Sequence, residues 1–98
     1  DNSDVQVLLE QIGEMSSDPI ATISYASRLL VESWQKPISD LQTTILSDTI
    51  LTTLEMLPSG GLLIHALRQN LHSIFGLDVL TAQRCEKYID AWLSSHLT

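Results

Sequence analysis

The sequence predicts an all-α fold, a compact bundle of about five short helices. Apolar residues recur at intervals of three and four in five segments, which is the period of a helix with one buried face. Short runs containing Pro, Gly, Ser and Asp, residues that end helices, separate these segments. At 98 residues, 44% of them hydrophobic, the chain is long enough to bury its own core. We therefore expect residues 1–98 to form a single domain and, since the first residue is not Met, to be a fragment of a longer protein.

The first two helices are predicted over residues 3–15 and 19–35. Asp18 and Pro19 mark the start of the second helix, because Asp is favoured just before the first turn and Pro is tolerated within it. Pro37 should end that helix, since the residue before a proline is pushed away from helical angles. The apolar face of the second helix is wide enough to pack against two neighbours.

The third helix is predicted over residues 39–57, where Ser39 and Gln42 have the spacing of a capping box. Its many threonines would suit a β-strand by composition. The apolar residues are nevertheless spaced by three and four rather than by two, which favours a helix. A kink at Ser47-Asp48 is compatible with this pattern.

The last two helices follow a break at residues 58–61, which read Pro-Ser-Gly-Gly. The fourth helix is predicted over residues 62–75, with Gly76 placed to end it. Asp78 should cap the fifth helix. The apolar stripe of the fifth helix consists of Ala82, Cys85, Ile89, Trp92 and Leu93.

The charge of the chain restricts its partners. Twelve acidic and five basic residues give a net charge of −7, which repels nucleic-acid phosphates and anionic lipids. We expect no nucleic-acid partner and, since no apolar run approaches the roughly 18 to 20 residues of a membrane span, no membrane partner. Three acidic residues recur every four positions, a spacing that suits either a solvated face or a contact with a Lys- or Arg-rich peptide: Glu10, Glu14 and Asp18.

Residues that could carry out chemistry are few. Cys85 is the only cysteine, which suits a reducing nuclear or cytoplasmic setting, and its place on an apolar stripe favours a packed thiol over a nucleophile. His65 and His72 lie seven residues apart, whereas paired metal ligands on one helix are normally three or four apart. We therefore predict no enzymatic activity, no metal and no cofactor.

The two tryptophans end apolar helical stretches, and each could be a core residue or a binding anchor. Trp92 is the better candidate for the core. Trp34 is the better candidate for a functional surface, because Lys36 and Ile38 follow it and could extend it into a shallow groove.

Residues 20–38, which read Ile-x-x-Ile-x-x-Ala-x-x-Leu-Leu-Val-x-x-Trp-x-x-Pro-Ile, resemble the closing helix of the N-terminal domain of S-II-class transcription elongation factors. Residues 51–58, Leu-x-x-Leu-x-x-Leu-Pro, are similar to the opening helix of that domain, and residues 84–93 could be a second Trp-ended closing helix. The family's domain is a small helical bundle, named for its Leu-Trp signature, that docks other transcription proteins. The resemblance implies a core containing Trp92, Leu54 and Leu57. It implies a docking groove near Leu63, Leu67 and Arg68.

Together these observations predict a non-enzymatic protein–protein interaction module that docks a short peptide or partner helix in a groove between helices, within a transcription-related assembly. The alternative is a homodimerisation or structural packing domain, in which the leucine-rich third or fourth helix pairs with its own copy. The predicted partner-binding residues are Trp34, Lys36, Ile38, Leu63, Leu67 and Arg68.

Overall fold

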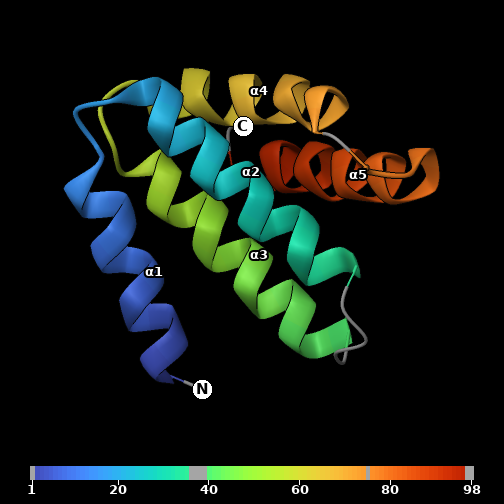
Figure 1. Cartoon of the computed structure of the whole chain (residues 1–98), viewed down its shortest axis with the longest axis horizontal. Helices are drawn as coiled ribbons and strands as arrows, with labels where there is room; N and C mark the ends of the chain where they lie inside the picture. Colours follow the sequence, from blue (N-terminus) through green and yellow to red (C-terminus); the bar gives the residue numbers. More distant parts are fainter. Residues whose placement is uncertain (1, 36–39, 75, 97–98) are drawn as a thin grey trace.

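The structure, a computed structural model, describes residues 2–35, 40–74 and 76–96 and contains only helices and turns within them (Figure 1). The helices are α1 (Asn2–Glu14), α2 (Pro19–Gln35), α3 (Asp40–Glu55), α4 (Gly60–Asn70) and α5 (Val79–His96), with a short 3₁₀ turn, η1 (Leu71–Ser73), directly after α4. The predicted all-α bundle of about five helices is confirmed. None of the described helices is both long and apolar enough to cross a membrane.

Helix α2 is the central element of the bundle. It contacts α1, α3, α4 and α5, which is more neighbours than the two predicted from its wide apolar face. Helices α2 and α3 lie side by side, with α1 on one side of the pair and α4 and α5 on the other (Figure 1). The core between these layers consists of residues no more than 4% exposed: Leu8, Ile12, Ala26, Leu30, Val31, Ile50, Leu51, Leu54, Ile64, Leu67, Leu71, Cys85, Ile89 and Trp92.

Asp18 and Asp78 cap the starts of the two helices for which the sequence predicted them as caps. The backbone N–H of Ala21 donates to Asp18 Oδ1 at 3.1 Å, at the start of α2. At the start of α5, the Thr81 N–H and hydroxyl donate to the two oxygens of Asp78 at 3.0 and 2.6 Å. These hydrogen bonds lower the pKa of Asp78 below its ordinary value, because they favour the charged carboxylate. The bond from the Thr81 hydroxyl has the largest effect and the bond from the Thr81 N–H the next largest. Both predicted N-caps are confirmed.

Helix α3 is one continuous helix from Asp40 to Glu55, which includes the Ser47-Asp48 position where the sequence allowed a kink. Threonine hydroxyls along it donate to carbonyls one turn earlier: Thr49 to Ile45 at 2.8 Å and Thr53 to Thr49 at 2.6 Å. The helix therefore accommodates these threonines, because their hydroxyls donate hydrogen bonds to its backbone carbonyls. Ser39, the first residue of the predicted capping box, lies outside the described residues.

Helix α4 differs from its predicted bounds at both ends. It begins at Gly60, after Ser59 in a left-handed conformation with φ of 60°, and ends at Asn70 rather than at residue 75. The chain then tightens into η1, which places Leu71 in the core at 1% exposure. Gly76 has the left-handed φ of 83° expected of it, but it follows η1 and a short connection instead of capping α4 directly.

Small hydroxyl residues are buried where α2 packs against its neighbours, a feature that the sequence analysis did not predict. The Ser33 hydroxyl donates to the Leu30 carbonyl at 2.6 Å, and the Thr43 hydroxyl of α3 donates across to the Ser33 carbonyl at 3.2 Å. Because these short side chains bond to nearby carbonyls, they can be buried without leaving a polar group unpaired. The buried hydroxyl residues of α2 and α3 are Thr22, Ser27, Ser33, Thr43 and Ser47.

Candidate functional site

A groove runs between α2 and the segment formed by α4 and η1. It consists of two adjoining hollows of about 350 and 500 Å³, which share Ser24, Asn70 and Ser73 in their linings. Because they share walls, the hollows form one continuous depression. It is termed the α2–α4 groove, and its principal residues are Ile20, Ile23, Arg28, Glu32, Ala66 and Asn70.

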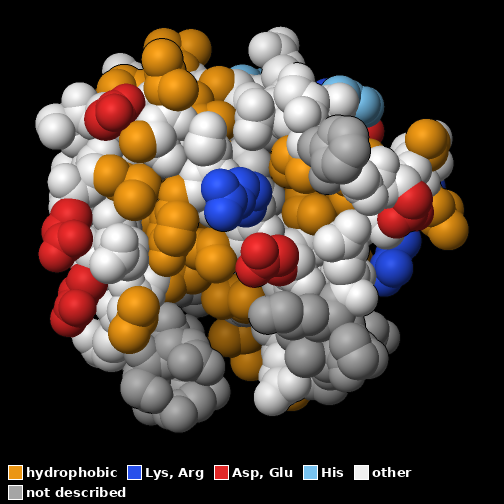
Figure 2. Space-filling view, viewed as in Figure 1, with side chains coloured by type: hydrophobic (Ala, Val, Ile, Leu, Met, Phe, Trp, Pro, Cys, Tyr) orange, Lys and Arg blue, Asp and Glu red, His pale blue; other side chains and the backbone are white. Residues whose placement is uncertain are grey.

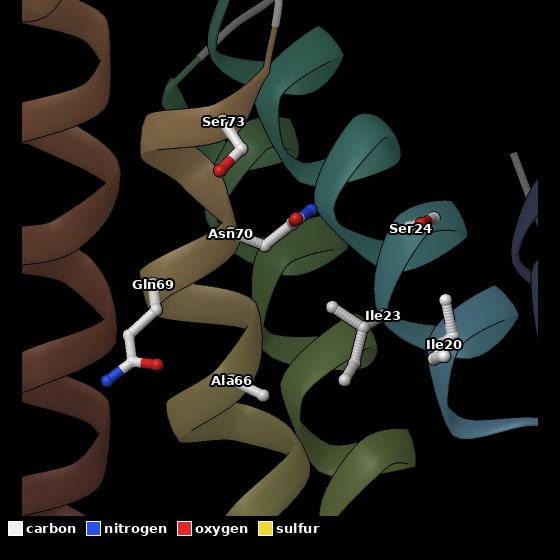
Figure 3. Close-up of a pocket in the computed structure, with 7 residues that line it drawn as sticks. All are labelled: Ile20, Ile23, Ser24, Ala66, Gln69, Asn70 and Ser73. Carbon is white, nitrogen blue, oxygen red and sulfur yellow. The ribbon is translucent and has the colours of Figure 1, made fainter.

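One end of the α2–α4 groove is apolar. Ile23 of α2 and Ala66 of α4 point into the space between the two helices (Figure 3). Ile20, in the first turn of α2, lines the same hollow and is 79% exposed. Leu62 lies one helical turn before Ala66, is 73% exposed, and extends the same face of α4. Covering one such exposed side chain with a partner would contribute about 1.5 to 3 kcal/mol.

The middle of the groove contains an amide group in a defined orientation. The Ser27 hydroxyl donates to the Ile23 carbonyl, so its oxygen can only accept a further hydrogen bond. Asn70 Nδ2 donates to that oxygen at 2.9 Å (Figure 3 shows Asn70 directed towards α2). This pairing turns the Asn70 carbonyl oxygen away from Ser27, and no described residue donates to it. The groove therefore presents an available hydrogen-bond acceptor beside its apolar end.

The other end of the groove is charged. Arg28 and Glu32 lie one turn apart on α2, are both exposed, and line the larger hollow together with Asn70. Charges of opposite sign next to an apolar wall can select the orientation of a bound peptide.

Two of the predicted partner-binding residues belong to the core. Leu63 is 8% exposed and Leu67 is fully buried, so neither can contact a partner while α4 stays packed. The face of α4 that lines the groove carries Ala66 and Asn70 instead, one position before and three positions after Leu67. The face of α4 that lines the groove is therefore not the face that carries the predicted residues Leu63 and Leu67.

Arg68, also predicted to bind a partner, instead joins α4 to α5. Its Nε and Nη2 atoms donate to the two carboxylate oxygens of Asp90 at 2.8 and 3.1 Å, and its Nη1 lies 3.4 Å from Glu86 Oε2. The hydrogen bond with Asp90 raises the pKa of Arg68 above its ordinary value. His72 Nε2 lies 3.0 Å from the same Glu86 oxygen. The guanidinium is thus occupied within the chain. The remaining predicted residues, Lys36 and Ile38, lie outside the described residues.

Trp34 is half-buried and joins three helices. Its indole N–H donates to Ser47 Oγ of α3 at 3.2 Å, and its ring lies 5.7 Å from the ring of Tyr88 on α5. The Arg84 guanidinium lies 5.0 Å from the centre of the indole ring, within the range of a cation–π interaction. The pKa of Tyr88 is raised to about 12, mainly because burial disfavours the charged phenolate and secondly because the negative charge of Asp48 is nearby. Trp34 thus links α2 to α3 and α5 and carries Arg84 over its ring.

Cys85 is fully buried, as the sequence predicted, and we expect its thiol to be protected from alkylating and disulfide reagents. Burial raises its pKa from the ordinary 9.0 to about 11, so very little reactive thiolate is present near pH 8. Labelling with a chromogenic disulfide should be slow in the native protein and rapid in denaturant. Fast native labelling at pH 8 would contradict this assignment.

Within the described ranges, no three His, Cys, Asp or Glu side chains are grouped as metal ligands would be. Comparisons of the chain with protein families, with curated proteins and with solved structures find no match. The α2–α4 groove must therefore be interpreted from its own geometry and chemistry.

Proposed function

We propose that this chain is a non-enzymatic protein–protein interaction module that docks a short peptide or partner helix in the α2–α4 groove. The main support is the apolar wall formed by the exposed Ile20 and the half-buried Ile23 and Ala66, which continues directly into polar and charged groups. Grooves between two helices accept amphipathic helices in this way, with apolar anchors of the partner at intervals of three and four residues.

Each part of the groove has a separate role in this proposal. An apolar side chain of the partner packs against Ile20 and Ile23 and supplies most of the affinity. The Asn70 carbonyl accepts a hydrogen bond from a backbone or side-chain donor of the partner. Arg28 and Glu32 then favour one direction of binding through their opposite charges.

We place this module in a transcription-related assembly, in the nucleus or cytoplasm. The support is the resemblance of residues 20–38 to the docking domain of S-II-class elongation factors. This segment includes the α2 residues that line the groove, Ile20 and Ile23 among them.

The proposal is tested by selecting helical peptides that bind the protein from a display library and mapping the amide shifts they cause. We expect the shifts to lie along the α2–α4 groove and the Ile20→Asp variant to bind about tenfold more weakly, the loss expected for one apolar contact. Val79→Asp is the matched control, since Val79 on α5 is 73% exposed and the charge change is the same. Selected peptides that bind elsewhere, or equal affinities of the two variants, would disprove docking in this groove.

The homodimer alternative makes a different prediction. Sedimentation equilibrium over a range of concentrations would show a reversible dimer, and Ile20→Asp would abolish it if the groove accepts a second copy. A mass that stays monomeric at every concentration excludes this alternative.

A further inference from the structure

A second exposed apolar surface lies between α1 and α3. A hollow of about 370 Å³ is lined by Leu9 of α1 and by Ile45 and Met56 on the α3 side. These side chains are 38%, 51% and 80% exposed. Leu41, one turn before Ile45, is 69% exposed and continues the same stripe. This surface is termed the α1–α3 face.

The stripe has the length of a helical binding site. Leu41 and Met56 are fifteen positions apart along α3 and its last turn, which corresponds to about 22 Å at 1.5 Å per residue. Between them, Thr49 and Thr52 line the hollow with small side chains. A partner helix of about four turns would match this length.

The charged residues of α1 and α3, the two helices that form the α1–α3 face, are all acidic. Neither α1 nor α3 contains Lys or Arg. Asp48 lines the hollow itself, while Glu10 and Glu55 are the chain neighbours of Leu9 and Met56. None of these carboxylates forms an ion pair with a described residue, and Asp48 accepts only a hydrogen bond from Tyr88 at 3.3 Å. Figure 2 shows acidic side chains along the outer edge of α1.

We propose that the α1–α3 face binds a Lys- or Arg-rich amphipathic helix of a partner protein. The apolar side of that helix packs on Leu9, Ile45 and Met56, and its basic residues pair with the surrounding carboxylates. A second copy of this chain would bring acidic groups against acidic groups, and phosphate-bearing partners would be repelled in the same way. This site is separate from the α2–α4 groove, so the module can hold two partner segments at once.

The probes for this proposal are two synthetic amphipathic peptides of about 16 residues, one of Leu and Lys and one of Leu and Glu with the same apolar positions. Binding is measured by calorimetry in about 0.15 M salt, where long-range attraction is screened, and is mapped by amide shifts. We expect the Leu/Lys peptide to shift residues of α1 and α3 and the Leu/Glu peptide not to bind. Shifts spread over every acidic region of the protein, or binding of both peptides, would overturn the proposal.

The Ile45→Asp variant separates docking from simple attraction of opposite charges. The variant makes the face more acidic, which by charge alone would strengthen binding of the Leu/Lys peptide, but it also removes an apolar contact. If docking depends on that contact, we expect this peptide to bind about tenfold more weakly. Val79→Asp adds the same charge on α5, and Ile20→Asp adds it in the α2–α4 groove; both should leave this affinity within about twofold of wild type. If Ile45→Asp binds as tightly as Val79→Asp, charge alone explains the binding and the proposal fails. A weakened Ile20→Asp would likewise overturn it, because the peptide would then occupy the other groove.

Discussion

Replacing Gly60 with Ala is expected to destabilise the fold by about 3 kcal/mol, the upper end of the usual range for overpacking. A Cβ atom at this position would lie 2.5 Å from the Leu54 carbonyl oxygen, and the Glu55 carbonyl oxygen would be closer still. These are backbone atoms at the end of α3, so no side-chain rotation can relieve the clash. The junction of α3 and α4 would have to open, which would also displace the α4 wall of the α2–α4 groove.

Gly61→Ala is the matched control for this prediction. A Cβ at Gly61 would meet nothing within 4 Å, and the residue lies in the first turn of α4. Since Ala is favoured over Gly in a helix by up to about 1 kcal/mol, this variant should be as stable as wild type or slightly more stable. Urea denaturation followed by circular dichroism measures both variants. Equal stabilities would show that α3 and α4 do not approach as closely at Gly60 as the structure has it.

Trp92→Ala is expected to lower the free energy of unfolding by about 3 to 5 kcal/mol, the range for removing a core aromatic side chain. Trp92 is 4% exposed and belongs to the central hydrophobic cluster. Its ring also stacks on His96 with centroids 4.1 Å apart, near the end of α5. Since a domain of this size is stable by about 5 to 15 kcal/mol, the loss would be a large share of the total.

Trp92→Phe tests the same site with a variant that should still fold. The indole N–H of Trp92 is buried and finds no acceptor among the described residues, so the smaller ring removes an unpaired donor as well as some packing. We expect a loss of no more than about 2 kcal/mol. The stabilities are compared by chemical denaturation followed by circular dichroism. Tryptophan fluorescence is less suitable, because removing Trp92 leaves only the signal of Trp34. A loss below about 1 kcal/mol for Trp92→Ala would place the residue at the surface instead.

Much of the fold could be predicted from local sequence. The apolar spacing and the Asp18 and Asp78 caps act within one or two helical turns, and both are found where the sequence indicated. The burial of Cys85 and Trp92 also follows from their position on the stripe of α5. The end of α4 was predicted five residues too late, because the tightening into η1 depends on packing Leu71 into the core.

The site was harder to predict, because its residues are adjacent only in the folded chain. In α4, Leu62 and Leu63 are chemically identical neighbours, yet one is 73% exposed and the other 8%. Arg68 looks like a free cation in the sequence, but its partner Asp90 lies 22 residues later on another helix. A small signal for the groove was Asn70, a polar amide at the end of α4 whose side chain hydrogen-bonds to Ser27 of α2.

By itself, the sequence determined that this chain forms an acidic bundle of about five helices, and where most of them begin. These properties depend on hydrophobic period, capping side chains and total charge, which act locally or as a sum over all residues. Only the tertiary structure decided which leucines of α4 face outward, that Arg68 is paired within the chain, and that exposed apolar residues gather in the α2–α4 groove and on the α1–α3 face. The physical reason is that a helix with apolar residues on more than one side has several nearly equivalent ways to pack, and the contacts with all its neighbours together select one.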